Sequence, residues 1–199
     1  TMNFDITFIP TEIAGYMDTL TISGSVFGDL ELPVSGQGIQ VVITASTDTL
    51  DFGDVGIGYD FTQILTISNT GMGTLDISEI ASDNTVFTVD ITDIVLDAGS
   101  YIDVSVTFMP DTSGNTNATL SIANDDPDTP LVSIPLSGFG VPGSISLTPY
   151  TLNFGDIVVG ETSTLALTVE NTSLGILEVS DIYSDHMDFT AEPPTSFTL

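Results

Sequence analysis

Apolar and polar residues alternate along much of this chain. In residues 102–108, four apolar side chains alternate with three polar ones. The same alternation runs through residues 30–34 and again through residues 164–169. A period of two places one side of an extended segment against a core and the other side in water. These segments are therefore predicted to be β-strands, and no segment shows a convincing helical period.

Short clusters rich in Asn, Asp, Gly and Pro separate the predicted strands. They include the tripeptides that begin at Asn69 and Asp97 and the Asn-Asp-Asp-Pro cluster that begins at Asn124. Such residues favour tight turns over helices. Hydrophobic residues make up 41% of the 199 residues, which is enough for a packed core and unlike a disordered acidic chain. The sequence therefore predicts an all-β fold.

The chain is internally repetitive. The segment Leu50–Gly58 returns as Leu152–Gly160, at an offset of 102 residues. A second match joins Ile6–Pro10 to Val106–Pro110, at an offset of 100 residues. A period of roughly 100 residues suits one β-sandwich per repeat. The predicted fold class is thus a tandem array of β-sandwich repeats.

The repeat boundaries divide the chain into three parts. Residues 1–39 match the C-terminal half of a repeat, residues 40–141 match one complete repeat, and residues 142–199 match the N-terminal half of another. We expect each half to be completed by a neighbouring subunit or by further covalent chain. Because the chain starts at Thr1 without an initiator Met, we expect a processed form or a window on a longer chain.

Both halves carry apolar strand faces that need an opposing sheet. Burying one such side chain stabilises a fold by roughly 1.5–3 kcal/mol. Seven of them in the first half, which include Leu30 and Leu32, would together contribute roughly 10–20 kcal/mol, as much as the net stability of a typical domain. The predicted polymer interface consists of Phe4, Ile6, Phe8, Leu20 and Ile22 in the first half, and Leu165, Leu167, Val169 and Leu177 in the last.

The charge of the chain is of one sign. It contains no Lys or Arg and 28 Asp and Glu residues, which gives a formal net charge of −28. Without cationic side chains we expect no nucleic-acid binding, and an anionic membrane surface would repel the chain. There is no Cys for a disulfide or a thiolate metal site, and no run of about 18 apolar residues that would insert into a membrane. Trypsin-like proteases find no site to cut, which suits an extracellular or cell-surface protein.

One turn is a candidate cation site. Asn124, Asp125, Asp126 and Asp128 are crowded together, and oxygen ligands at this density suit Ca²⁺. The same residues also suit a turn that precedes proline, and their spacing is not that of an EF-hand loop. Ca²⁺ is therefore a candidate ligand, and no cofactor is required.

Three further polar positions carry candidate chemistry. The single histidine, His186, is flanked by carboxylates and could act as a pH switch or metal ligand, but it is more simply an ordinary loop residue. Asn117 and Asn171 begin Asn-x-Ser/Thr sequences, which are glycosylation acceptors only if a glycosylating cell secretes the chain. No arrangement of a nucleophile with a base is evident, so an enzyme is not expected.

The repeated motifs resemble those of a known family. Leu-x-Phe-Gly begins at Leu50 and Leu152, Asn-Thr-x-x-Gly-x-Leu begins at Asn69, and Leu-Ser-Gly-x-Gly begins at Leu136. Their order and spacing are similar to the ASPM/SPD-2/Hydin class of immunoglobulin-like (Ig-like) domains, known in bacteria as choice-of-anchor D-like repeats of surface proteins. The resemblance covers nearly the whole chain. It implies a seven-stranded or similar β-sandwich that acts as a spacer or binding module.

The predicted function is that of a non-enzymatic extracellular structural protein. Ig-like repeats arranged head to tail, completed by strand exchange or by continuing chain, would form a filament, stalk or adhesin shaft, so the expected partner is the chain itself. The alternative is a cell-surface recognition module that binds a carbohydrate or protein through its loops. An exposed aromatic cluster would favour the alternative, and the candidates are Phe139, Tyr150 and Tyr183.

Overall fold

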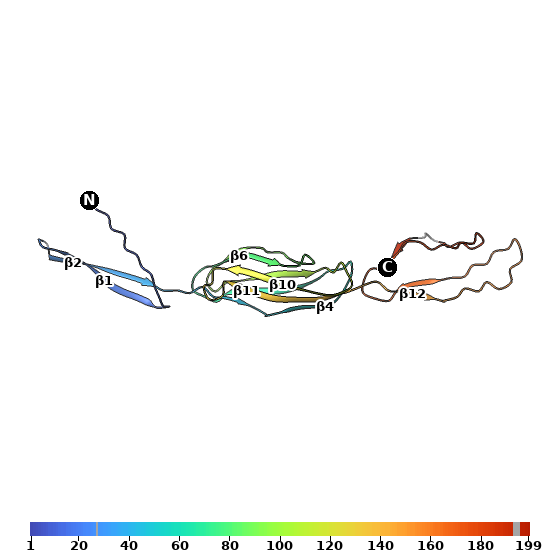
Figure 1. Cartoon of the computed structure of the whole chain (residues 1–199), viewed down its shortest axis with the longest axis horizontal. Helices are drawn as coiled ribbons and strands as arrows, with labels where there is room; N and C mark the ends of the chain where they lie inside the picture. The colour runs from blue at the N-terminus through green and yellow to red at the C-terminus, as the bar shows by residue number, and fades with distance from the viewer. Residues whose placement is uncertain (27, 193–195) are drawn as a thin grey trace.

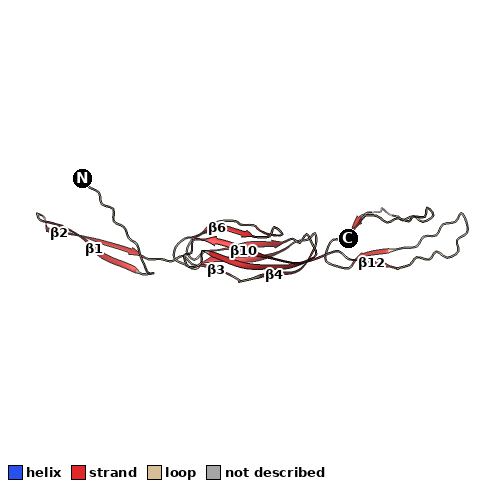
Figure 2. Cartoon of the chain, viewed as in Figure 1, coloured by secondary structure: helices blue, strands red, loops and turns tan. Residues whose placement is uncertain are grey.

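The computed structural model describes residues 1–26, 28–192 and 196–199. A central β-sandwich lies between an N-terminal hairpin and a C-terminal segment of short strands, and the three parts follow one another along the long axis of the molecule (Figure 1). Every regular element in the described residues is a β-strand, so the all-β prediction is confirmed (Figure 2). Over the same residues, no helix is long and apolar enough to cross a membrane.

Two sheets pack face to face in the central sandwich. One sheet has the strand order β4-β11-β10-β6-β8, and the other has the order β3-β5-β9-β7. Neighbouring strands are antiparallel except for β11 and β4, which run parallel. The strands are β3 (Ile43–Ala45), β4 (Leu50–Gly56), β5 (Phe61–Asn69), β6 (Leu75–Ser82), β7 (Phe87–Val89), β8 (Ile94–Leu96), β9 (Tyr101–Phe108), β10 (Gly114–Asn124) and β11 (Leu131–Val141).

The buried apolar core identified in the structure lies entirely within the central sandwich, between Ile43 and Leu136. At its centre three aromatic rings meet. The Phe87 and Phe108 rings stack with centroids 4.6 Å apart, and the Phe52 ring lies 5.4 and 5.8 Å from them. Aromatic pairs at such distances add stability beyond their buried area. The period-two alternation of residues 102–108 is thus realised on β9, whose apolar side faces this core.

Fewer strands lie on either side of the sandwich, and those on the C-terminal side are short. The N-terminal hairpin pairs β1 (Gly15–Gly24) with β2 (Gly28–Gln37), and residues 1–14 precede it without any strand. On the C-terminal side, β12 (Ile145–Thr148) pairs with β13 (Thr168–Asn171), and β14 (Glu178–Val179) pairs with β15 (Phe197–Thr198). These pairs form separate two-stranded sheets.

The strand predicted over residues 164–169 is realised only from Thr168 onward. Residues 152–158, which repeat the β4 sequence, also form no strand. A strand requires hydrogen bonds from a neighbour, and alternation of side chains does not supply them. In the central sandwich, β4 pairs only with β11 in its sheet. The sequence counterpart of β11 is not in the C-terminal segment, and this explains why residues 152–158 remain unpaired.

Candidate assembly interface

The N-terminal segment, residues 1–39, exposes an apolar face whose sequence counterpart is buried in the central sandwich. Val106 and Phe108 on β9 are 0% exposed, whereas the matching Ile6 and Phe8 are 63% and 49% exposed. Among the other predicted interface residues of this segment, Phe4 and Ile22 are exposed and Leu20 is half-buried. The same pattern of apolar residues is therefore buried in the central sandwich and exposed in the N-terminal segment.

The hairpin β1–β2 has the same register as the central hairpin β10–β11. Thr19 lies opposite Pro33 in the first, and Thr119 lies opposite Pro135 in the second. The sequence match between the two segments is thus also a match of backbone pairing. The N-terminal segment has the conformation of a sandwich piece although no opposing sheet covers it.

One side of the Phe8 ring is packed in the same way as the ring of its central counterpart, Phe108, and the other side is not. Its ring lies against Gly36, where no Cβ could be accommodated, just as the Phe108 ring lies against Gly138. Phe8 also contacts Tyr16 edge to face, with centroids 5.4 Å apart. The other side of Phe108 meets the remaining core rings, whereas the other side of Phe8 has no such partner among the aromatic contacts of the described residues.

The C-terminal segment, residues 142–199, also exposes apolar side chains whose counterparts are buried in the central sandwich. Leu167 is 39% exposed, although its central counterpart Leu65 on β5 is fully buried. Leu165 is 41% exposed, while Val169 and Leu177 are half-buried. The predicted interface residues of this segment thus lie on a face that the described structure leaves partly uncovered.

Two of the three core rings recur in the C-terminal segment. The Phe154 and Phe189 centroids lie 5.7 Å apart, close to the 5.4 Å between Phe52 and Phe87. The third ring of the central cluster, Phe108, has no counterpart in this segment. Its sequence counterpart is Phe8, in the N-terminal segment.

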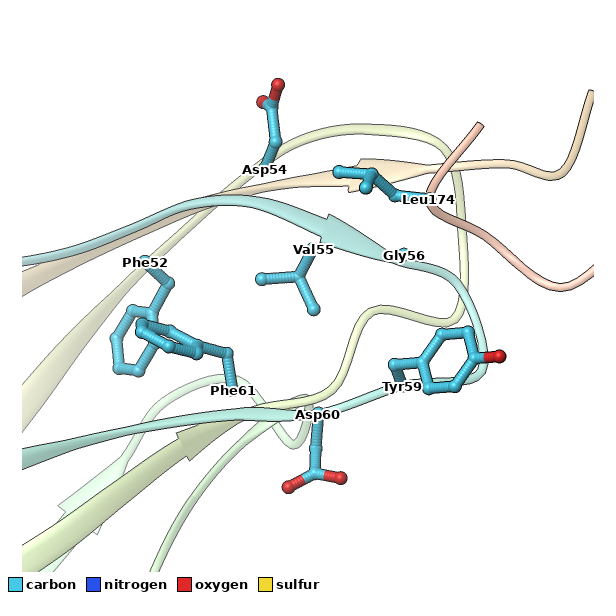
Figure 3. A pocket seen from close by; sticks show the side chains of 8 residues that line it. All are labelled: Phe52, Asp54, Val55, Gly56, Tyr59, Asp60, Phe61 and Leu174. Atoms are coloured by element: carbon cyan, nitrogen blue, oxygen red, sulfur yellow. The ribbon is translucent and has the colours of Figure 1, made fainter. Parts of the chain in front are cut away.

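A tight joint connects the central sandwich to the C-terminal segment. The Ile176 backbone N–H donates to the Ile57 carbonyl at 3.0 Å, and the Ile57 N–H donates to the Val141 carbonyl at 2.8 Å. Leu174 reaches over the end of β4 beside Gly56, where it lines a pocket with Phe52, Val55, Tyr59 and Phe61 (Figure 3). A Cβ at Gly56 would collide with the Leu174 backbone, so glycine permits this close approach.

Substitution of Gly56 by alanine is expected to open this joint. The added methyl group would push the Leu174 backbone away and break the Ile176–Ile57 hydrogen bond, which is worth roughly 1 kcal/mol. We expect amide hydrogen exchange at Ile176 to accelerate by about 5- to 10-fold. Gly15→Ala is the matched control, because a Cβ there meets nothing within 4 Å. Unchanged exchange in Gly56→Ala would contradict this account of the joint.

The turn at residues 124–128, where a cation site is predicted, binds the segment through which the chain enters the central sandwich. The buried Asp126 carboxylate accepts hydrogen bonds from the Ile43 and Asp128 backbone N–H groups, both at 3.0 Å. Asp128 in turn accepts a hydrogen bond from the Gln40 side chain at 2.5 Å. Asp125 accepts a hydrogen bond from the backbone N–H of Asp76 at 2.8 Å. The turn therefore ties the linker and β6 to the hairpin β10–β11.

The carboxylates of this turn are engaged with protein donors. Across residues 1–26, 28–192 and 196–199, no group of three or more acidic or histidine side chains is placed to hold a metal ion. The Ca²⁺ site predicted at Asn124, Asp125, Asp126 and Asp128 remains a prediction, and a comparison of melting temperatures in Ca²⁺ and in a chelator tests it.

Asp126→Ala is expected to destabilise the central sandwich by roughly 1–3 kcal/mol. The change leaves the backbone N–H of Ile43, and that of Asp128, without the acceptor it has in the folded chain. Denaturant unfolding followed by circular dichroism measures the effect. Asp93→Ala is the matched control, because Asp93 is exposed and, within the described residues, its carboxylate accepts a hydrogen bond only from the side chain of its neighbour Thr92. Equal stabilities of the two variants would refute the role of Asp126.

The predicted sugar acceptors differ in their surroundings. Asn117 is exposed on β10. The side-chain nitrogen of Asn171 donates to the carbonyls of Gly175 and Leu199 at 2.7 and 3.1 Å, and Asn69 makes the two equivalent bonds in the central sandwich at 2.7 and 3.0 Å. A glycan on the Asn171 nitrogen would displace bonds that shape this turn.

The remaining candidates are the single histidine and three aromatic residues, and the His186 ring meets the Phe189 ring edge to face with centroids 6.1 Å apart. His186 is exposed, and its Nδ1 lies 3.6 Å from a carboxylate oxygen of Asp188. Phe139 lies on β11, whereas Tyr150 and Tyr183 lie in the C-terminal segment. No aromatic contact in the described residues joins these three rings.

Comparison with family models identifies the central part of the chain. Residues 42–138 match a model described as HYDIN/CFA65/VesB-like, Ig-like domain. The matched range contains all nine strands of the central sandwich, apart from the last residues of β11. No curated protein sequence matches the chain.

Solved structures of similar shape include Ig-like and PapD-like domains. PapD-like domain 7 of human CEP192 is 14% identical, with 53% of this chain and 89% of that chain covered and a TM-score of 0.47. A protein of unknown function from Porphyromonas gingivalis W83 is 20% identical, with 65% and 67% covered and a TM-score of 0.45. The periplasmic chaperone SfaE is 8% identical, with 50% and 58% covered and a TM-score of 0.41.

Proposed function

We propose, from the premise that residues 42–138 are an Ig-like domain of the HYDIN/CFA65/VesB-like type, that this chain is a non-enzymatic structural protein. Its copies join head to tail into an extracellular filament, stalk or adhesin shaft. One observation carries the proposal: the two outer segments expose the apolar faces that the same sequence pattern buries in the central sandwich.

The energy of covering these faces is large enough to drive association. Roughly 1.5–3 kcal/mol is available for each apolar side chain that becomes fully buried. Phe4, Ile6, Phe8 and Ile22 are all about half exposed or more in the described structure. Contiguous exposed apolar surface on a monomer commonly marks an interaction surface.

The joints within the chain suit a semi-rigid rod. The joint between β11 and the C-terminal segment is held by backbone hydrogen bonds through Ile57. The linker before β3 is held by Asp126 and by a bond from the Met72 N–H to the Gln40 carbonyl at 2.8 Å. A head-to-tail contact between such units extends into a filament when the rotation between copies does not close into a ring.

Native and denatured masses test the proposal. We expect sedimentation of the native protein to show a series of assemblies, each dissociating in denaturant to a chain of 20.9 kDa. A much larger denatured chain would instead mean that the repeats are joined covalently. A native mass of 20.9 kDa at concentrations up to about 1 mM would overturn the proposed assembly.

Salt is expected to promote assembly. The N-terminal segment carries five acidic residues and the C-terminal segment eight, with no Lys or Arg on either. These segments therefore repel one another until ions screen them, and the screening length falls from about 10 Å at 0.1 M salt to about 3 Å at 1 M. Light scattering along a sodium chloride series should show mass rising with salt. A fall in mass with salt would show that attraction between opposite charges holds the assembly.

A further inference from the structure

We infer that the N-terminal segment inserts three strands into the C-terminal segment of a second copy of this chain, one strand into one sheet and two adjacent strands into the other. The inference rests on the proposed head-to-tail assembly and specifies its interface. It assigns each inserted strand its neighbours and its register. The central sandwich serves as the template for both.

In that template, three consecutive strands lie inside the two sheets. β9 lies between β5 and β7 in one sheet, and β11 and β10 lie between β4 and β6 in the other. The N-terminal segment carries the counterparts of these three strands: residues 1–8 match β9, and the hairpin β1–β2 matches β10–β11 in sequence and register.

The C-terminal segment carries the strands that flank these positions. By the offset of 102 residues, residues 152–158 match β4, residues 163–171 match β5, residues 177–184 match β6 and residues 189–191 match β7. The strand pairs that form here are β12–β13 and β14–β15, which correspond to the central pairs β3–β5 and β6–β8. These are the two central pairings that involve none of β9, β10 and β11. Strand structure is thus lost where those three strands would have supplied the hydrogen bonds.

The side chains of the two segments fit the same scheme. Phe8 would become the third ring beside Phe154 and Phe189, as Phe108 is beside Phe52 and Phe87. Thr62 and Thr107 share a hydrogen bond between their hydroxyl groups at 2.8 Å across β5 and β9. Threonines also occupy the two corresponding positions, Thr164 and Thr7.

A second copy is the occupant because the two segments together contain each strand of one sandwich once. Residues 142–199 supply the counterparts of β3 to β8, and residues 1–39 supply those of β9 to β11. The C-terminal segment of one copy and the N-terminal segment of another thus supply a full set of these strands. Insertion at these positions gives every inserted strand two hydrogen-bonded neighbours, as β9, β10 and β11 have in the template.

Engineered disulfides test the register, one in each sheet. The chain has no cysteine, so any disulfide is the introduced one. Thr7→Cys with Thr164→Cys corresponds to the opposed pair Thr107–Thr62, and Ser35→Cys with Asn153→Cys corresponds to Ser137–Asp51. Directly opposed Cα atoms are roughly 4.5–5.5 Å apart in an antiparallel pair such as β5–β9, and neighbouring strands in a parallel pair such as β11–β4 lie roughly 4.8 Å apart. Both spacings are within disulfide range, whereas diagonal neighbours two residues along lie at roughly 7–8 Å. Thr7→Cys with Ala166→Cys is therefore the out-of-register control.

After mild oxidation of the assembled full-length variants, we expect both in-register pairs to give a ladder in non-reducing SDS gels at multiples of 20.9 kDa. The ladder should collapse to one band on reduction, and the control should give at most a tenth as much cross-linked chain. Filaments without either ladder, or with the control linking best, would overturn the inferred register while head-to-tail assembly stands. A wild-type chain that stays monomeric would overturn both. If one pair of cysteine substitutions prevents assembly even under reducing conditions, the ladder from the pair in the other sheet tests the register.

Discussion

Substitution of Phe8 by alanine is expected to abolish filament formation and to leave the central sandwich folded. The Phe108 side chain at the corresponding position is fully buried among core rings, and truncation of such a residue to alanine costs roughly 3–5 kcal/mol. Phe8 lies outside the buried core of the central sandwich, so in the proposed assembly this cost falls on the contact between copies. Association should weaken on the order of 10²- to 10³-fold.

Sedimentation velocity at a concentration where the wild type is fully assembled measures this effect. Met17→Ala is the matched control, because Met17 lies in the same segment on β1 and is 90% exposed. Thermal unfolding of both variants should retain the transition of the central sandwich. If Phe8→Ala assembles as well as Met17→Ala, the Phe8 face does not contribute to the contact between copies.

The pattern of the sequence was sufficient to predict strands wherever the chain also contains their neighbours. Residues 102–108 alternate, and they form β9 because β5 and β7 lie on either side of it. Residues 30–34 alternate, and they lie in β2 because β1 is adjacent in the sequence. In both cases the local pattern and the available hydrogen-bond partners agree.

The same pattern failed where the partner is not within the same segment. Residues 164–169 alternate as clearly as residues 102–108, yet the strand begins only at Thr168, where β12 pairs with it. Alternation determines which side of a segment is apolar, but backbone pairing is a contact between residues far apart in sequence. A sequence pattern therefore predicts that a strand can form, and the neighbour decides whether it does.

Some residues of the candidate interface could be predicted from the sequence and others could not, for a related reason. The interface residues follow from repeat matching, because the complete repeat reveals which side chains should be covered. The role of Asp126 does not follow, since its acceptor bond to the Ile43 N–H spans 83 residues. Nor does the contact of Gly56 with Leu174, which has no local signal beyond the presence of a glycine. The crowding of carboxylates in the turn at residues 124–128 predicts a Ca²⁺ site, and that stays a prediction. The hydrogen bonds that Asp125 and Asp126 accept from backbone N–H groups could not be read from the local sequence.

Two truncated chains should combine into a complex that cannot grow. A chain of residues 40–199 retains the central sandwich and the C-terminal segment, and a chain of residues 1–141 retains the N-terminal segment and the same sandwich. Each then carries one of the two complementary faces, so neither can polymerise alone. Mixed together, they should form a 1:1 complex, because the N-terminal strands of one complete the C-terminal segment of the other and no free face remains.

Sedimentation of the two chains, alone and mixed, measures this outcome, and either truncated chain added to wild type should shorten the filaments by blocking one end. The affinity of the pair should rise with salt in parallel with wild-type assembly, since the same acidic segments meet. Growth of either truncated chain into long assemblies would show that a face other than the exposed Phe8 and Leu167 surfaces joins the copies. Absence of the 1:1 complex under conditions where the wild type assembles would show that completion of half-sandwiches does not drive assembly.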